Sequence, residues 1–309
     1  MFCDTVVYIM SKIDTTHTNT PLLEVVGPQK DYELIDSGNG RKLERFKDVV
    51  LSRPDPQALW EPFLSNEKWD SADAYFVRKG NSTEWKFNNP NVPKEWIVSF
   101  ENISLWVKPT SFKHTGVFPE QISNWKWMSD TISSSSQKDI KVLDLFGYTG
   151  GASLVCAKAG AQVTHIDGSK ASVGWAKDNA ELSGLEHAPI RYLIDDVRAF
   201  VSREIRRGNT YHGIIMDPPS FGYGPKDEPW KIEEHLKELM DLVSQILDKD
   251  ALFVVLNGYA SGFSSISYLN MLENVTGQKG GTVEHGELAL MASSNKRLLP
   301  AGIFARWRK

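Results

Sequence analysis

The sequence predicts an α/β protein in which a doubly wound, mostly parallel sheet follows a small β-rich domain. From residue 141 onward, short apolar runs that suit buried strands alternate with amphipathic runs that suit helices. Residues 21–115 instead contain short aromatic segments interrupted by Asn-Pro and Val-Pro. We therefore expect a flexible tail over residues 1–20, a small β-rich domain over 21–115 and an α/β domain over 116–309.

The composition of the 309 residues, with 41% hydrophobic and 24% charged residues, is typical of a soluble globular protein. No apolar run approaches the ~18 residues that a membrane-spanning helix needs, and the N-terminus is a poor match to a signal peptide. Two cysteines, Cys3 and Cys156, exclude a disulfide framework and a cysteine-rich zinc site. These features fit a cytoplasmic location. The net charge of −4 implies that any contact with nucleic acid is local or depends partly on shape and stacking.

The β-rich region begins with "RKLERFKDVVLSRP", residues 41–54, which predicts one strand leading to a proline. Seven of the ten tryptophans lie between Trp60 and Trp127, where they either fill a core or form a face on which bases stack. Further along, "GVFPEQISNWKWMSDTI" predicts a helix that begins near Pro119, a residue tolerated in a first helical turn.

Strands and helices then alternate through the α/β region. We expect strands over residues 141–146, 161–167, 190–195, 212–217, 251–257, 282–290 and 302–307. We expect helices over residues 149–160, 169–184, 197–208, 230–247 and 264–275. In such a sheet, ligands bind beyond the carboxyl ends of the strands, so the residues that follow the strands are the candidates for a site.

The segment "DLFGYTGG", residues 144–151, turns the first of these strands into a helix. Its glycines allow the backbone to approach a ligand, and the helix N-terminus offers free N–H groups. The spacing is not G-x-G-x-x-G, so the pyrophosphate fingerprint is missing. Asp144 at the mouth of this loop suits a ligand that carries an ammonium and a sulfonium better than one with two phosphates.

Acidic residues also end the second and third strands. Asp167 stands where an acid commonly binds the ribose hydroxyls of a nucleoside cofactor. Asp195 and Asp196 follow the third strand, where an acid can accept a hydrogen bond from an adenine amino group. Asp196 is alternatively, or in addition, the cap of the helix that follows.

The segment "DPPSF", residues 217–221, ends the fourth strand with a rigid corner, because two prolines cannot continue a strand ladder. The Asp217 carboxylate and a proline carbonyl can accept the hydrogens of a planar nitrogen and hold its lone pair toward an electrophile. Phe221 can stack on the ring. Alone, the pentapeptide is more typical of a turn, but its place in a sheet with three other motifs favours a catalytic role.

These motifs resemble those of the class I S-adenosylmethionine-dependent methyltransferases. Within that class they resemble the bacterial group related to the large-subunit ribosomal RNA cytosine-5 methyltransferases. The matching text is "VFPEQISNW", "VLDLFGYTGGASLVCAKAGAQVTHIDGSKASVGWAKDNAELSGL", "IDDVRAF" and "IIMDPPSFGYGPKDEPWKI", in this order within about residues 116–260. The resemblance implies a seven-stranded Rossmann-like sheet and S-adenosylmethionine as the cofactor.

The resemblance also implies roles for individual residues. The loop from Asp144 to Gly151 would hold the methionine part of the cofactor, Asp167 the ribose and Asp196 the adenine. The cofactor-binding candidates are Asp144, Phe146, Gly147, Tyr148, Thr149, Gly150, Asp167, Ser169, Asp195, Asp196 and, from "FPEQ", Gln121. The catalytic candidates that would face the acceptor are Asp217, Pro218, Pro219 and Phe221. No metal ligands are expected.

Two departures from this group bear on the substrate. Its RNA-acting members often begin with a basic PUA module, which residues 21–115 do not convincingly contain. Methylation of cytosine at carbon 5 needs a thiolate, and the group places that cysteine just after the fifth strand. This chain has "VVLNGYASGF" there, while Cys156 falls among apolar helix residues and Cys3 in the tail. We therefore expect methylation at nitrogen, on a ribosomal RNA base.

The segment "FGYGPKDEPWK", residues 221–231, is glycine-rich, aromatic and basic. It forms either a mobile lip over an RNA acceptor, with Tyr223 stacking and Lys226 on a phosphate, or an ordinary surface loop.

Other interpretations of the function of the protein stay open. They are a methyltransferase that acts on a protein side chain or a small molecule, an NAD-dependent dehydrogenase, and a non-catalytic RNA-binding protein. The oligomeric state is open as well.

Overall fold

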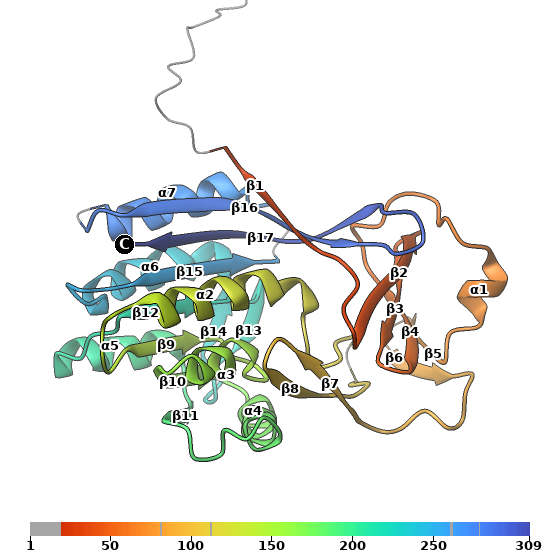
Figure 1. Ribbon diagram of the computed structural model, residues 1–309, viewed down its shortest axis with the longest axis horizontal. Coiled ribbons are helices and arrows are strands. Elements are labelled where there is room, and N and C mark those ends of the chain that lie inside the picture. Colours follow the sequence, from red (N-terminus) through yellow and green to blue (C-terminus); the bar gives the residue numbers. More distant parts are fainter. Residues whose placement is uncertain (1–19, 81, 112, 260–261, 278) are drawn as a thin grey trace, which may run out of the picture.

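The structure is a computed structural model that describes residues 20–309, apart from residues 81, 112, 260, 261 and 278. The predicted tail up to residue 19, with Cys3, lies outside the described residues. Figure 1 shows a large sheet flanked by helices and, beside it, a smaller β-rich part. Within the described residues, no helix is long and apolar enough to cross a membrane.

An eight-stranded sheet forms the centre of the larger part. Its strand order is β1-β16-β17-β15-β12-β9-β10-β11, and only the pairs made by β17 are antiparallel. The seven predicted strands are all present, which confirms the mostly parallel, doubly wound sheet. The strands are β1 (Leu22–Val26), β9 (Lys141–Leu145), β10 (Gln162–Asp167), β11 (Ile190–Ile194), β12 (Gly213–Met216), β15 (Phe253–Gly258), β16 (Thr282–Met291) and β17 (Leu298–Arg308).

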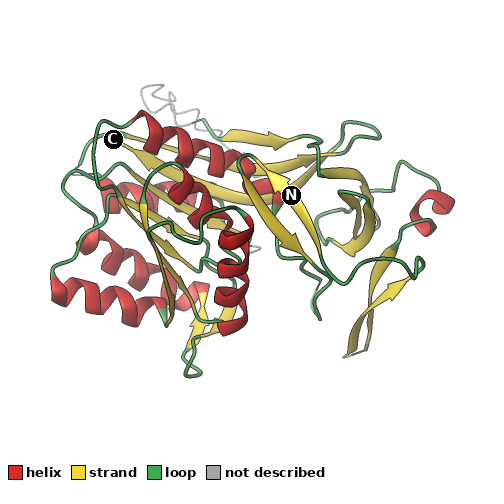
Figure 2. Cartoon of the chain, turned by 60° about the horizontal axis from the view of Figure 1, so that its bottom comes forward, coloured by secondary structure: helices red, strands yellow, loops and turns green. Residues whose placement is uncertain are grey.

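Helices cover both faces of this sheet (Figure 2). One hydrophobic cluster packs α2 and α3 on one face, and a second packs α5, α6 and α7 on the other. In β9, Val142 belongs to the first cluster and Leu143 to the second, so the strand is apolar on both faces. The elements are the 3₁₀ turn η1 (Pro119–Gln121), α2 (Ile122–Ser134), α3 (Gly151–Lys158), α4 (Lys170–Leu182), α5 (Val197–Arg207), α6 (Ile232–Ile246) and α7 (Ser265–Thr276).

The N-terminal part is β-rich, as predicted. It contains a five-stranded sheet, a β7–β8 hairpin and the short helix α1 (Asn66–Asp70). Residues 41–54 form two strands, so the prediction of one strand was wrong: the chain reverses at Lys47, whose φ is 58°. The strands are β2 (Tyr32–Gly38), β3 (Arg41–Phe46), β4 (Val49–Pro54), β5 (Ala74–Lys79), β6 (Ser82–Phe87), β7 (Trp96–Phe100) and β8 (Ile103–Val107).

Strand β1 belongs to the large sheet although it precedes the small one. It pairs in parallel with β16, which adds an eighth strand to the seven that the sequence predicts. Arg306 of β17 joins the neighbouring strands, because its guanidinium donates to Glu24 over 2.6 Å and to Glu284 over 2.9 Å. The division of the chain at residue 115 stays a prediction, but residues before it complete the large sheet.

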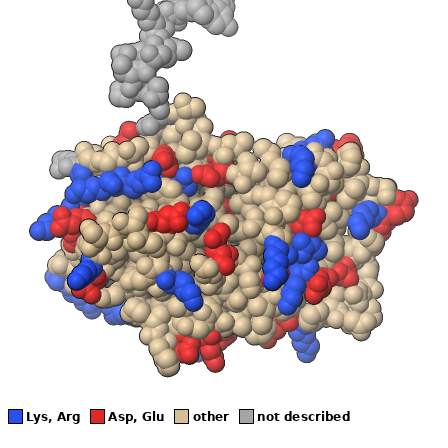
Figure 3. Space-filling model, in the orientation of Figure 1, with Lys and Arg blue, Asp and Glu red and all other residues tan. Residues whose placement is uncertain are grey.

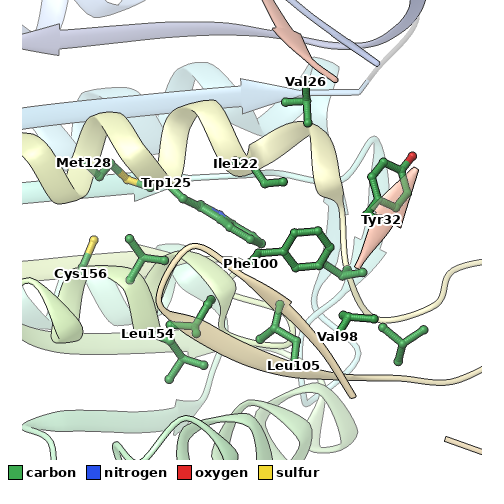
Figure 4. Close-up of a cluster of buried hydrophobic side chains, with 14 of the residues drawn as sticks. Val26, Tyr32, Val98, Phe100, Leu105, Ile122, Trp125, Met128, Leu154 and Cys156 are labelled. Atoms are coloured by element: carbon green, nitrogen blue, oxygen red, sulfur yellow. The ribbon is translucent and has the colours of Figure 1, made fainter. Parts of the chain in front are cut away.

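One hydrophobic cluster continues from the N-terminal part into the larger part (Figure 4). Phe100 of β7 lies between Tyr32 and Trp125, with ring centroids 6.3 Å apart in both pairs. Cys156 is buried in the same cluster, as predicted, and burial raises the pKa of its thiol well above the usual value. Trp96 and Trp125 are buried there too, so these two tryptophans are core residues.

Candidate active site

A cavity of about 910 Å³ lies where the carboxyl ends of β9, β10, β11 and β12 meet. The N-terminal part also contributes to its wall, through Lys42, Arg53, Lys113 and His114. Gly150, Phe221 and Lys226 do not line the cavity. The other candidates do, namely Asp144, Phe146, Gly147, Tyr148, Thr149, Asp167, Ser169, Asp195, Asp196, Gln121, Asp217, Pro218, Pro219 and Tyr223.

Asp144 ends β9 as a buried carboxyl group that is only 2% exposed. The Ser153 hydroxyl lies 2.6 Å from Asp144 Oδ2, to which it donates, and 2.9 Å from the Nδ1 of buried His165. Burial raises the pKa of Asp144 to about 7. Gly147 lies tightly over this group, since a Cβ there would be 2.4 Å from the His165 ring. The loop therefore needs glycine at position 147, because a larger residue there would collide with the His165 ring.

Asp167 holds the loop that follows β9. Its Oδ2 accepts the backbone N–H of Tyr148 over 2.9 Å, and its Oδ1 accepts that of Ser169 over 2.8 Å. Phe146 and Tyr148 have φ values of 62° and 48°, in the left-handed region that non-glycine residues rarely adopt. Backbone strain of this kind persists where surrounding contacts enforce it, and it is concentrated at functional sites.

Contacts of Thr149 and Gly150 with neighbouring segments fix the shape of the loop after β9. The Thr149 hydroxyl donates to the Gly116 carbonyl over 2.6 Å, which ties the loop to the segment before η1. Gly150 caps α3 in the left-handed region, with φ 89°, and a Cβ there would be 3.0 Å from the Cβ of Ala176. Position 150 therefore serves the turn and the packing against α4.

The two acids after β11 have different partners. Asp195 forms an ion pair with Arg203 of α5. Asp196 caps α5, because its Oδ1 accepts the backbone N–H of Ala199 over 2.9 Å. The capping alternative for Asp196 is thus confirmed, and the residue lines the cavity at the same time.

Asp217 reaches the cavity from the end of β12. Its Oδ1 is almost completely shielded from solvent and has no hydrogen-bond partner among the described residues. Burial raises the pKa of Asp217 to about 8, and the negative charges of Asp144 and Glu120 add to this effect. The carbonyl of Pro219 accepts the indole N–H of Trp230 over 2.7 Å. This hydrogen bond anchors the proline corner, and it means that the Pro219 carbonyl already has a donor within the protein.

The segment after the proline corner is a β-hairpin rather than an irregular loop. Strands β13 (Phe221–Tyr223) and β14 (Pro229–Lys231) pair in antiparallel fashion. Phe221 is 56% exposed and makes an edge contact with Tyr223, with ring centroids 5.1 Å apart. The hairpin covers the end of β10, because a Cβ at Gly168 would be 2.9 Å from the Tyr223 carbonyl oxygen.

Residues that the sequence did not single out also line the cavity, among them Glu120, Asn257 and Tyr259. The Gln121 amide donates to the Tyr259 hydroxyl over 2.7 Å. Asn257 and Tyr259 stand at the carboxyl end of β15, just as the acids stand at the ends of other strands. Their position in the sequence, at the end of a predicted strand, could therefore have identified them as candidates. Glu120 carried no such signal, because its burial depends on residues distant in the sequence.

The chemistry of the cavity fits S-adenosylmethionine. Asp144, Asp217 and Glu120 are carboxyl groups with pKa values raised to about 7, 8 and 7, mainly by burial. A ligand that carries an ammonium and a sulfonium would favour the ionised forms of such groups, and a pyrophosphate would oppose them. Asp144 and the loop up to Gly151 would hold the methionine part, Asp167 the ribose and Asp196 the adenine.

Comparison with known proteins also indicates an S-adenosylmethionine-dependent methyltransferase. Residues 74–264 match the model of the S-adenosylmethionine-dependent methyltransferase family. A crystal structure of a SAM-dependent methyltransferase from Agrobacterium tumefaciens has 40% sequence identity and a TM-score of 0.89, over 94% of each chain. The structure of SMU.776, a methyltransferase complexed with SAH, has a TM-score of 0.69 over 90% of this chain and 76% of that one. Its 18% identity shows likeness of fold alone.

Curated relatives include ribosomal RNA methyltransferases. Ribosomal RNA large subunit methyltransferase K of Neisseria meningitidis is 26% identical over 54% of this chain and 46% of its own length. Methyltransferase K/L of Shewanella frigidimarina is 28% identical over 73% of this chain and 30% of its own. This chain thus spans less than half the length of either relative. Because the family model matches more than half of the chain, this protein belongs to the S-adenosylmethionine-dependent methyltransferases, and S-adenosylmethionine is its cofactor.

Proposed function

We propose that this protein transfers a methyl group to a nitrogen atom of a ribosomal RNA base, in the cytoplasm and without a cysteine nucleophile. The observation that carries the proposal is the position of Asp217. Asp217 lines the same cavity as the loop that begins at Asp144, and one oxygen of its carboxyl group has no hydrogen-bond partner among the described residues. One cavity therefore has a place for the methyl donor and a hydrogen-bond acceptor for the group that receives the methyl.

Positioning is the main contribution of the protein to such a reaction. Bound S-adenosylmethionine supplies an electrophilic methyl carbon: the nitrogen lone pair forms the new bond, sulfur keeps the electrons of the broken bond, and the acceptor nitrogen releases a proton. The Asp217 carboxyl group accepts an N–H hydrogen and thereby orients the lone pair. Trp230 keeps the corner rigid through Pro219. Phe221 is proposed to stack beside the acceptor ring, although it lies outside the cavity of the free protein.

Nitrogen is favoured over carbon 5 of cytosine because the latter reaction needs a thiolate. Cys156 has no exposed surface, and burial raises the pKa of its thiol. Just beyond the end of β15, the described residues that line the cavity are Tyr259, Gly262 and Phe263, and the Tyr259 hydroxyl accepts a hydrogen bond from Gln121. These features support a reaction that uses the lone pair of the acceptor directly.

RNA is favoured as the substrate class by the named activities of the Neisseria and Shewanella relatives. The β13–β14 hairpin offers exposed Phe221 and Tyr223 for stacking on bases, with Lys226 at its turn. Basic and acidic side chains are interspersed on the face seen in Figure 3, which is consistent with local contact to RNA. A target base inside a helix would have to be unstacked before it could enter the cavity.

A second candidate acceptor is a protein side chain or a small molecule. The net charge of −4 favours it, because RNA-binding proteins usually carry an excess of Lys and Arg.

The test uses radiolabelled S-adenosylmethionine with RNA and protein extracted from cells that lack this gene. Nuclease and protease are then applied separately. Release of the label by nuclease is expected, and mass spectrometry of nucleosides would identify the base. Release by protease alone, or label in small molecules alone, would reject RNA as the substrate.

A further inference from the structure

Glu120 is a buried acid at the cavity with no assigned role. It lies in η1, immediately before α2, and is 4% exposed. Glu120 lines the cavity, and its Oε2 has no hydrogen-bond partner within the part of the chain that the structure describes. A buried polar atom without a partner costs free energy, and it calls for an explanation such as a ligand. Asp217 Oδ1 is in the same situation at the same cavity.

The charges around Glu120 do not account for its burial. Lys42 and Arg53 act on it from the N-terminal part, but both are paired with Glu44, at 3.7 Å and 2.7 Å. From the large sheet, the charge of Glu120 acts on Asp217 and on the phenol of Tyr259. Among the described residues, no cation lies within ion-pair distance of Glu120. Burial raises the pKa of Glu120 to about 7.

The turn that carries Glu120 is held against the methyltransferase sheet. The side chain of the next residue, Gln121, donates to the Tyr259 hydroxyl over 2.7 Å. The Asn124 amide of α2 donates to Gln121 Oε1 over 3.0 Å and to Asn257 Oδ1 over 2.9 Å. The backbone at position 120 is thus fixed relative to the end of β15, which keeps Glu120 at the cavity.

We propose that Glu120 is a second acceptor-binding residue and that the acceptor is a primary amino group. Such a nitrogen carries two hydrogens, and the cavity is lined by two carboxyl groups from different elements, those of Glu120 and Asp217, each with an oxygen that has no hydrogen-bond partner among the described residues. A ring nitrogen without hydrogens would give the ionised forms of these two groups no donor. This inference rests on the proposed methyl transfer to nitrogen.

The test compares Glu120→Ala and Glu120→Gln with the wild-type protein, using whichever extract fraction takes up the label. Glu120→Ala is expected to raise the KM for that acceptor about tenfold, the effect of one lost hydrogen bond. Glu120→Gln keeps an acceptor oxygen and is expected to restore part of this loss. Both variants should bind S-adenosylhomocysteine like the wild type in isothermal titration calorimetry.

Glu204→Gln is the matched control. Glu204 is another buried acid, but it bonds to Tyr211, Asn209 and Arg207 away from the cavity. This variant is expected to lower the Tm and leave the KM unchanged. If Glu120→Ala behaves in the same way, with a lower Tm and an unchanged KM, Glu120 is a structural residue and the proposal is overturned.

A binding experiment separates this proposal from the choice of substrate. The protein saturated with S-adenosylhomocysteine is mixed with guanosine or with inosine, which lacks the amino group, and saturation-transfer NMR signals are recorded. A stronger guanosine signal that Glu120→Ala abolishes supports the proposal, even if no RNA fraction takes up label. Equal signals, or no signal from either nucleoside, count against it.

Discussion

The backbone N–H of Tyr148 donates to Asp167 Oδ2 over 2.9 Å, and this bond joins the loop after β9 to the end of β10. The same carboxylate accepts the N–H of Ser169, so Asp167 holds the backbone of two loops at once. Tyr148 has a φ of 48°, which is an unfavourable conformation for a tyrosine. Asp167 is therefore both a ribose-binding candidate and the residue that keeps the loop after β9 in place.

Replacement of Asp167 by alanine should weaken S-adenosylhomocysteine binding by about 1–3 kcal/mol, because charge-assisted hydrogen bonds are lost and the loop is released. Isothermal titration calorimetry measures this change. Asp178→Ala, on the exposed face of α4, is the control and should bind normally. An unaltered affinity in Asp167→Ala would mean that another group binds the ribose.

Asp217→Ala should show the opposite pattern, with cofactor affinity retained and turnover reduced about 100-fold or more. The reason is that Asp217, at the end of β12, is the proposed acceptor-binding residue, whereas most of the cofactor-binding candidates lie at the carboxyl ends of β9, β10 and β11. Single-turnover transfer of label measures the turnover, and calorimetry measures the affinity for the cofactor. If Asp217→Ala lost cofactor binding instead, the two strand ends would have been assigned in the wrong order.

Gly147→Ala should weaken cofactor binding and lower stability by about 1–3 kcal/mol through overpacking, since the added Cβ would lie 2.4 Å from the His165 ring. Gly174→Ala is the matched control. A Cβ at Gly174 of α4 would meet nothing within 4 Å, so this change should stabilise the helix by about 0.5–1 kcal/mol. Denaturant unfolding separates the two outcomes, and equal effects of the variants would contradict the close packing at Gly147.

The stability of the free protein should fall as pH rises, because burial raises the pKa of Asp217 to about 8 and of Asp144 and Glu120 to about 7. A raised carboxyl pKa favours folding fully below its unfolded value near ~4, and this contribution is lost as pH rises through the folded value. Asp217→Asn should reduce this pH-dependent loss of stability by about 1–3 kcal/mol. The check is denaturant unfolding at about pH 5 and about pH 9, and an unchanged pH dependence in Asp217→Asn would argue against a buried acid.

Lys226→Ala should weaken RNA binding and reduce the slope of log Kd against log salt by about one, as expected when one phosphate contact is lost. Lys226 lies in the turn of the β13–β14 hairpin, outside the cavity, so cofactor binding should not change. Lys158→Ala, at the C-terminal end of α3, is the control. An unchanged salt slope would leave the hairpin as an ordinary surface element.

Much of the site was predictable because it follows from the parallel sheet. Asp144, Asp167, Asp196 and Asp217 all stand at or near the carboxyl ends of strands that the sequence predicts. Parallel neighbours end at the same edge, so these residues meet once the strands pair. The β13–β14 hairpin was not predicted, since its two strands have only three residues each and give no periodic signal.

By itself, the sequence determined the alternation of strands and helices, the acids at the strand ends and the proline corner, because these depend on local pattern and chain order. Only the tertiary structure decided that β1 joins β16. It also decided that Glu120 lies at the cavity with no hydrogen-bond partner for its Oε2 among the described residues. Burial and hydrogen-bond pairing depend on neighbours that are far apart in the chain, and a pattern of adjacent residues carries no information about them.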